Sequence, residues 1–248
     1  MTEQIIAQRL GIALRQVQGT VRLLRDGATI PFISRYRKEA TGSLDELQVG
    51  AVKEQLDKLT ELEARKQTVL STIGEQGKLT DELRKRIEAC WEAVELEDIY
   101  LPYKPKRRTR ATVARERGLE PLANSIMAQN SHDIARQAQR FVTADVPTPE
   151  EAIAGACDII AERVSEDERA RNSVRRTAAR EGAVHSRLVK GKEQEGVKYS
   201  DYFDATSPLR TVSSHRFLAM RRGMDEGILK ISVEMDADRI TEGLCRQF

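Results

Sequence analysis

Two stretches of the sequence are rich in arginine and lysine, the side chains that bind phosphate groups. The first basic block, residues 104–117, carries seven basic residues and one acidic residue, a local net charge of +6. The second basic block, residues 169–192, carries eight basic residues and one acidic residue, a local net charge of +7. The rest of the chain has a net charge of −11, although the total is only +2. This polarised distribution is typical of a surface that faces a polyanion. The candidate nucleic-acid-binding side chains are Lys104, Lys106, Arg107, Arg108, Arg110, Arg175, Arg176 and Arg180.

The chemistry predicted for these side chains is phosphate binding without sequence readout, because each cation placed against a phosphate releases counterions. Aromatic side chains that could stack on bases are scarce near the first block, where Tyr100 and Tyr103 are the candidates. A second interpretation stays open. The arginines could pair with carboxylates and hold helical subdomains together, since a guanidinium fits a carboxylate as well as a phosphate. For the arginines between residues 175 and 180, phosphate contact and simple solubility are equally supported.

A third basic group, Arg35, Arg37 and Lys38, lies in the segment FISRYRKE. A recognition helix for DNA would need these side chains exposed to base edges. Ile33 and Tyr36, however, indicate that at least one face of this helix lies in a core. We therefore expect Arg35, Arg37 and Lys38 to serve the structure of the protein.

Motifs for catalysis and metal binding are absent from the sequence. His132, His185 and His215 are far apart and lack an HExxH pattern or a cysteine pair, so we expect no metal site. No Walker loop, dinucleotide-binding fingerprint or nucleophile elbow is present. Ser213 and Ser214 precede an apolar run and are predicted to cap a helix rather than to act as nucleophiles. We expect a protein that is not an enzyme and needs no cofactor or small-molecule substrate.

Helices are predicted to position the basic side chains. Three short helices in the first forty residues resemble a helix-turn-helix unit: the first ends at Gly11, the second near Asp26, and Pro31 opens the third. Residues 43–46 then form a capping box, with Ser43 as the cap, for a helix of about eight turns whose apolar stripe ends at Gly74.

A further helix is predicted from the spacing of Leu83, Ile87, Trp91 and Val94, which places the single tryptophan in a core. Two prolines in LPYKPKRRTR, residues 101–110, break the helical pattern. The cations of the first basic block should therefore be exposed on an extended segment or loop.

The rest of the chain is predicted to be helical up to Gly182. Thr148 and the proline after it open one helix, and a capping box at residues 165–168 opens a second helix that is mostly surface. Residues 229–235 alternate between apolar and polar, which predicts a strand. The last helical stretch, residues 236–248, has no terminating signal, so we expect a truncated chain. The fold class expected is mainly α, with a small β contribution near the C-terminal end.

The composition excludes several classes of protein. The chain has 248 residues, of which 40% are hydrophobic and 32% charged, and its mean hydropathy is −0.52. It is too apolar for a disordered chain and has no apolar run long enough to span a membrane or serve as a leader, so a cytoplasmic protein is expected. Cys90, Cys157 and Cys245 are widely spaced and should be reduced packing residues.

Three long stretches carry a family resemblance: TIPFISRYRKEATGSLDE at residues 29–46, LEDIYLPYKPKRRTRATVARERGLEPLA at 96–123, and KYSDYFD with PLRTVSSHRFLAMRRGMDEG within 198–227. Together they closely resemble the N-terminal region of the Tex family of bacterial transcription accessory proteins. The resemblance implies a helical N-terminal region that is followed, in longer family members, by an RNase-H-like domain of the YqgF type, helix-hairpin-helix motifs and an S1 domain. This sequence is expected to stop at or before the RNase-H-like domain.

The resemblance and the basic blocks together predict a helical fragment of a transcription accessory factor that offers RNA or DNA a basic surface without sequence specificity. The alternative is a helical scaffold that docks a protein, either RNA polymerase, another transcription protein or further domains of the same polypeptide. The domain limits expected are residues 1–78 for a helix-turn-helix-like unit with the long helix, 79–190 for a helical core with the basic loop, and 191–248 for a linker and short β element. No membrane partner is expected.

Overall fold

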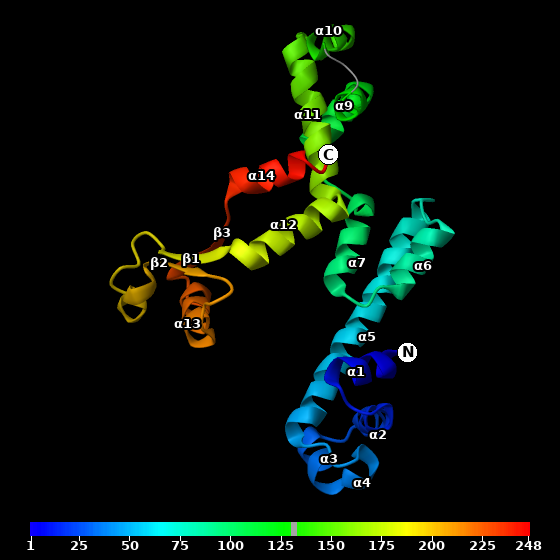
Figure 1. Cartoon of the computed structure of the whole chain (residues 1–248), viewed down its shortest axis with the longest axis vertical. Helices are drawn as coiled ribbons and strands as arrows, with labels where there is room; N and C mark the ends of the chain where they lie inside the picture. The colour runs from blue at the N-terminus through cyan, green and yellow to red at the C-terminus, as the bar shows by residue number, and fades with distance from the viewer. Residues whose placement is uncertain (130–132) are drawn as a thin grey trace. The chain divides into compact units, whose positions relative to one another are not determined.

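The computed structural model describes residues 1–129 and 133–248 and divides the chain into two compact units, Met1–Pro105 and Lys106–Phe248 (Figure 1). Helices form most of both units, and the second unit also contains a small sheet. The mainly α fold class with a small β contribution is confirmed. A domain division at residues 78 and 190 stays a prediction.

The first unit is organised around one long helix, α5. Its elements are α1 (Thr2–Leu10), α2 (Leu14–Arg25), α3 (Ile30–Tyr36), α4 (Lys38–Thr41), α5 (Glu46–Glu75), α6 (Asp81–Ala89), α7 (Ala93–Tyr100) and the 3-10 helix η1 (Leu101–Tyr103). The buried stripe of α5, which includes Val52, Leu59 and Ile73, packs against α1, α2 and α3 on one part of its length and against α6 and α7 on another. Gly11 and Gly27 both have positive φ, as predicted for residues that end helices.

The predicted capping residue of the long helix was wrong. Ser43 has a φ of +65° and lies in the left-handed region, where a residue cannot serve as an extended N-cap. Asp45 is the cap instead: its Oδ1 accepts a hydrogen bond of 2.8 Å from the Gln48 amide, and its own amide donates to Gln48 Oε1 at 3.1 Å. Because the helix begins only at Glu46, Leu47 is exposed in the first turn rather than part of the buried stripe.

The single helix predicted through Trp91 and Val94 is two helices. Cys90 has an extended conformation that ends α6, and α7 begins at Ala93. Trp91 lies in the link and is partly buried, and Val94 is exposed. The ring centroid of Trp91 is 3.8 Å from the ammonium of Lys66, which donates to the Glu88 carbonyl at 2.8 Å. Burial lowers the pKa of Lys66, so this cation–π contact and hydrogen bond stabilise a charge that the core disfavours.

The second unit has a helical part and a sheet. Its elements are α8 (Arg110–Glu116), α9 (Glu120–Met127), α10 (Ile134–Ala138), η2 (Gln139–Phe141), α11 (Pro149–Glu166), α12 (Glu168–Glu181), β1 (Ala183–Leu188), η3 (Val197–Tyr202), β2 (Asp204–Pro208), α13 (Ser214–Asp225), β3 (Leu229–Glu234) and α14 (Ala237–Cys245). Helix α11 is central, with α8, α9 and α10 packed on it. Thr148 caps α11 as predicted, whereas α12 is capped by Asp167 rather than Ser165, because α11 continues to Glu166.

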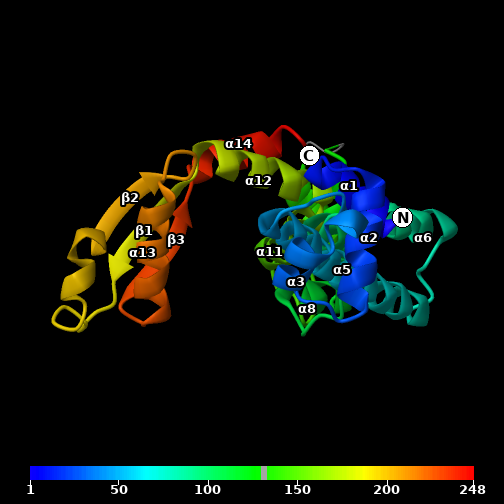
Figure 2. The same cartoon turned by 90° about the horizontal axis from the view of Figure 1, so that it is seen from below.

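The sheet is antiparallel with the strand order β2-β1-β3, and α13 packs against it (Figure 2). Only β3 was predicted. The central strand β1 buries His185 and Ser186, so its sequence lacks the alternation of apolar and polar residues that marks a half-buried strand. Val184 on β1 and Met220 on α13 form the apolar contact between sheet and helix.

His185 joins the three strands through its imidazole ring. Nδ1 is 2.6 Å from Oε1 of Glu234 on β3, and Nε2 is 2.6 Å from Oδ1 of Asp204 on β2. The hydrogen bonds with Glu234 and Asp204 raise the pKa of His185, against burial and the charge of Arg187. The imidazolium form donates to both carboxylates at once.

Folding of the sheet should therefore depend on pH through His185. Because the pKa is raised in the folded state, its contribution to the free energy of unfolding is complete below the unfolded-state pKa of about 6.5 and is lost as the pH rises through the folded-state value. We expect the wild type to lose stability relative to His185→Gln over that range, in thermal unfolding followed at a series of pH values. Parallel pH profiles for the two proteins would contradict this linkage.

Candidate nucleic-acid interface

The first basic block follows η1 as an extended segment and then enters a helix. Lys104, Arg107 and Arg108 lie outside any helix on the exposed stretch that was predicted. The end of the block differs from the prediction, because α8 begins at Arg110. Thr109 starts this helix by accepting a hydrogen bond of 3.0 Å from the Thr112 amide.

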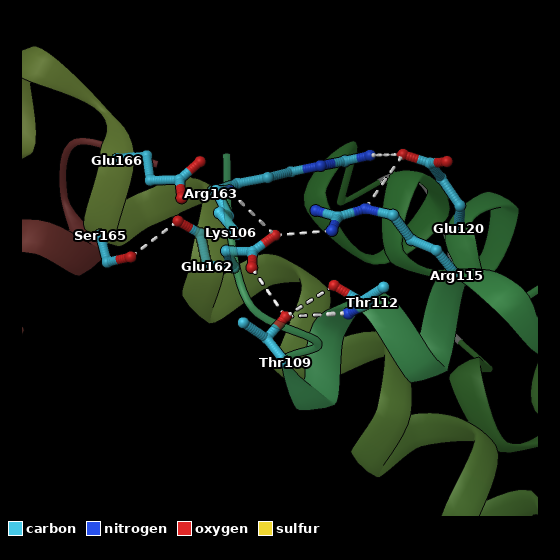
Figure 3. Close-up of polar contacts among 9 residues, drawn as sticks. All are labelled: Lys106, Thr109, Thr112, Arg115, Glu120, Glu162, Arg163, Ser165 and Glu166. Carbon is cyan, nitrogen blue, oxygen red and sulfur yellow. Dashed lines mark hydrogen bonds and ion pairs between the residues drawn. The ribbon is translucent and has the colours of Figure 1, made fainter. Parts of the chain in front are cut away.

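Lys106 and Arg115 of the block converge on a carboxylate of α11, Glu162 (Figure 3). Arg115 Nη1 is 2.6 Å from Glu162 Oε2, Lys106 Nζ is 3.5 Å from the same oxygen, and the Thr109 hydroxyl donates to Glu162 Oε1 at 3.0 Å. Lys106 also forms an ion pair with Glu166. These contacts fasten the extended segment and α8 to α11.

The Glu162 side chain is only 11% exposed. Burial by itself raises the pKa of this carboxyl, but hydrogen bonds from Arg115 and Thr109 and the charge of Lys106 outweigh burial, so the pKa of Glu162 lies below its usual value. The carboxylate form is therefore the one that holds the segment in place. Lys106 and Arg115 therefore form ion pairs with carboxylates of the same chain, which is the role that the second interpretation of the basic residues predicts.

The remaining arginines at the start of the second unit point outward. Arg110 Nε is 3.5 Å from Asp158 Oδ1, yet the Arg110 side chain is 88% exposed. Arg108 Nη2 is 2.7 Å from Glu116 Oε2, and both side chains are more than half exposed. Arg107 is exposed, and among the described residues it has no ion pair. Lys104 is exposed as well and belongs to the first unit.

The arginines of the second block lie on α12, whose one buried residue in the described structure is Ala170. The prediction of a mostly surface helix is confirmed. Arg176 and Arg180 are one turn apart on the same face and are exposed; Arg180 pairs with Glu181 at 2.7 Å. Arg175 is less exposed, donates to Asn172 Oδ1 at 2.5 Å, and lines a cavity.

That cavity has a volume of about 890 Å³ and lies within the second unit, where α9, α11, α12 and α14 contribute to its lining. Its walls are mainly apolar and include Ile160, Val174 and Leu244. Cys157 and Cys245 also line it and are exposed, so the expectation that all three cysteines pack in a core holds only for the buried Cys90. All three cysteines are free in the structure.

The placement of Tyr36 in a core was wrong. Ile33 is fully buried, but Tyr36 is 66% exposed, and Arg35, Arg37 and Lys38 are exposed beside it. The reason is that α3 has only two turns, and Ile33 and Ser34 already fill its inner face. The signal that could have found this surface is the spacing of Phe32 and Tyr36, which are four residues apart and therefore share a helix face.

Three further predictions concern metal ligands, the serines at the start of α13 and membrane-spanning helices. Within residues 1–129 and 133–248, no group of three or more His, Cys, Asp and Glu side chains could hold a metal ion, and His132 lies outside these residues. Ser213 is the N-cap residue of α13, as predicted, although its Oγ lies 3.3 Å from His215 Nε2 rather than bonding the helix backbone. In the same described part of the chain, no helix combines the length and apolar character required to cross a membrane.

Comparison with known proteins identifies relatives along most of the chain. Residues 1–74 match the family described as Tex-like protein N-terminal domain, and residues 129–247 match the one described as Tex central region-like. The chain is 46% identical over 235 residues to the transcriptional accessory protein Tex of Neisseria gonorrhoeae, covering 95% of this chain and 31% of that protein. It is 48% identical to protein YhgF of Escherichia coli, covering 94% of this chain and 30% of the relative.

A more distant relative is the human S1 RNA-binding domain-containing protein 1, which is 26% identical over 250 residues and covers 98% of this chain and 25% of the relative. The chain therefore spans about a third of the length of its bacterial relatives. Two family matches in order, with close identity to Tex and YhgF along nearly the whole chain, show that this protein belongs to the Tex family.

Proposed function

We propose that this chain contributes an electrostatic, sequence-nonspecific surface for RNA or DNA to a transcription accessory protein. The names of its relatives support this function, since one is called a transcriptional accessory protein and another an S1 RNA-binding domain-containing protein. The surface proposed lies on the second unit and consists of Arg107, Arg108, Arg110, Arg176 and Arg180, with Arg175 at its margin and Lys106 as the residue that anchors the segment. Lys104 belongs to the first unit and stays a separate candidate for phosphate contact.

One observation carries the proposal: the largely buried carboxylate of Glu162 binds the side chains of Lys106 and Thr109, while the arginines of the same segment face solvent. The contacts of Glu162 already order this segment. The segment therefore loses less conformational entropy when it binds a phosphate. The ion pairs of Arg108 and Arg110 are exposed, and pairs of this kind contribute only about 0–1 kcal/mol. A phosphate can therefore replace Glu116 or Asp158 as the partner at little cost.

The salt dependence of binding tests this surface. We expect fluorescence anisotropy of labelled RNA and DNA to show an affinity that falls steeply as salt rises. A triple variant, Arg107→Ala, Arg108→Ala and Arg110→Ala, should lower the affinity and reduce the slope of log affinity against log salt by about 2 to 3, because three phosphate contacts are lost. Lys106 is left unchanged in this variant because it holds the segment to α11.

The matched control removes the same charge elsewhere. Lys53→Ala, Lys58→Ala and Lys85→Ala delete three exposed cations from α5 and α6, of which Lys53 and Lys58 pair with acidic residues on their own helix. This control should keep the slope of the wild type. If both triple variants changed the slope equally, the effect would come from net charge, and the surface on the second unit would be refuted.

A second candidate function is a scaffold that docks a protein, such as RNA polymerase, another transcription protein or other domains of the same polypeptide. The observation that favours it is the apolar cavity of about 890 Å³ beside α11, α12 and α14. Docking of an apolar protein segment depends weakly on salt, whereas phosphate binding depends on it strongly. In either case we propose that the chain has no catalytic activity, and incubation of labelled RNA and DNA with the purified chain should leave both uncut.

A further inference from the structure

Two aromatic rings lie next to each other on the solvent-facing side of α3. Phe32 is 40% exposed and Tyr36 is 66% exposed. Their ring centroids are 5.6 Å apart and their planes meet at 43°. The two residues are separated by one helical turn, so the helix backbone fixes their spacing.

Neither ring belongs to the apolar core of the first unit. Helix α3 packs on α5 through Ile33, which is fully buried, and the Ser34 hydroxyl donates to the Pro31 carbonyl at 3.2 Å on the same side. An aromatic side chain is among the groups most favoured to be buried, so two neighbouring rings left in solvent indicate a surface that contacts something else.

Three cations share this short segment with the two rings. The Arg37 guanidinium carbon is 5.4 Å from the centroid of Phe32, and Arg35 and Lys38 are exposed on the same short segment. The acidic residue in this segment, Glu39, is 3.9 Å from Arg37 in an ion pair between exposed side chains, which is a weak one. We call Phe32, Arg35, Tyr36, Arg37 and Lys38 the aromatic platform.

We propose that the aromatic platform binds single-stranded nucleic acid by stacking unpaired bases on Phe32 and Tyr36 while Arg35, Arg37 and Lys38 contact the phosphates. Exposed aromatic rings among cations are the features with which proteins bind single strands without sequence preference, because every base offers a π-face. An apolar protein segment would gain nothing from the three cations, whereas a polyanion is attracted by them. The inference rests on the proposed nucleic-acid function and adds a second contact, made through bases rather than phosphates alone.

Base stacking can be separated from phosphate binding with two probes of equal charge. One is a labelled single strand of about 20 nucleotides, and the other is an abasic strand of the same length, which keeps the phosphates and lacks the bases. We expect the wild type to prefer the strand with bases. The double variant Phe32→Leu and Tyr36→Leu should lose about 5-fold to 100-fold in affinity for that strand and nothing for the abasic one, with an unchanged salt slope.

Two controls accompany this measurement. Val94→Ala shortens an exposed apolar side chain on α7 of the same unit and should leave both affinities unchanged. Tyr36→Phe keeps an aromatic ring at this position, so it should retain the affinity for the strand with bases that Tyr36→Leu loses. Because Phe32 and Tyr36 are exposed, the leucine variants should also unfold at the temperature of the wild type.

The outcomes distinguish this inference from the proposed function. If the leucine variants bind both strands as the wild type does, while Arg107→Ala, Arg108→Ala and Arg110→Ala lowers the salt slope, the platform does not bind bases and the phosphate surface stands. If no strand binds even at low salt, both proposals are overturned. A preference for a duplex over the single strand that is lost in the leucine variants also refutes stacking, because duplex bases are already stacked on one another.

Discussion

Gly19→Ala should destabilise the first unit by about 3 kcal/mol, a large share of the stability of a domain of this size. A Cβ atom at residue 19 would lie 2.0 Å from the carbonyl oxygen of Ala40, where α2 crosses α4. The obstacle is backbone rather than a flexible side chain, so the two helices would have to move apart. That movement would disturb the buried Thr41 and the hydrogen bond of 3.0 Å from Gln16 Nε2 to the Gly42 carbonyl.

Gly50→Ala is the matched control for this substitution. Gly50 is also inside a helix, α5, but a Cβ atom there meets no atom within 4 Å. Alanine has the higher helix propensity, so this variant should be as stable as the wild type or more stable by up to about 1 kcal/mol. Fluorescence of Trp91, which lies in the first unit, during urea unfolding measures both effects. Equal midpoints for Gly19→Ala and the wild type would show that α2 and α4 are not in close contact.

The ends of the helices in the first unit were predictable where they depend on glycine or proline residues close by in the sequence. The glycines after α1 and α2 and the proline of α3 act within one turn of the chain, so they mark the same ends in the sequence and in the fold. The cap of α5 was not predictable at the right residue, since Ser43 and Asp45 are both good capping residues. The choice depends on the left-handed turn at Gly42 and Ser43, which connects α4 to α5.

Tertiary contacts decided the features that the sequence analysis missed. The apolar spacing from Leu83 to Val94 suits a continuous helix, but the extended link around Trp91 places that ring beside Lys66 of α5, a residue far away in the sequence. In the same way, β1 does not look like a strand because its buried His185 is satisfied by carboxylates on β2 and β3. Neither partner can be identified from the spacing of residues within one element.

The basic residues of the candidate interface show the same limit. Charge density located the first basic block, and proline correctly predicted that its beginning is extended and exposed. Charge density could not divide the block into two roles, because the division depends on which cations face Glu162. Lys106 and Arg115 do, and Arg107 and Arg110 do not.

Glu162→Gln should destabilise the second unit by about 2 kcal/mol, because a neutral amide cannot satisfy the cations that converge on this carboxylate. Urea unfolding followed by circular dichroism should show a lower midpoint, while the transition reported by Trp91 in the first unit should stay where it is. The matched control, Glu116→Gln, breaks the exposed pair with Arg108 and should cost less than about 0.5 kcal/mol. If the two variants lost the same free energy of unfolding, burial of Glu162 would not strengthen its ion pairs.

The pH dependence of the Glu162 variant provides an independent check on the same contacts. The folded-state pKa of Glu162 is lowered, so its contribution to the free energy of unfolding is complete above the unfolded-state pKa of about 4.3 and is lost as the pH falls through the folded-state value. The difference in stability between the wild type and Glu162→Gln should therefore be constant near neutral pH and shrink in acid. A difference that persisted in acid would have to come from packing, since by then the charge of Glu162 has been neutralised.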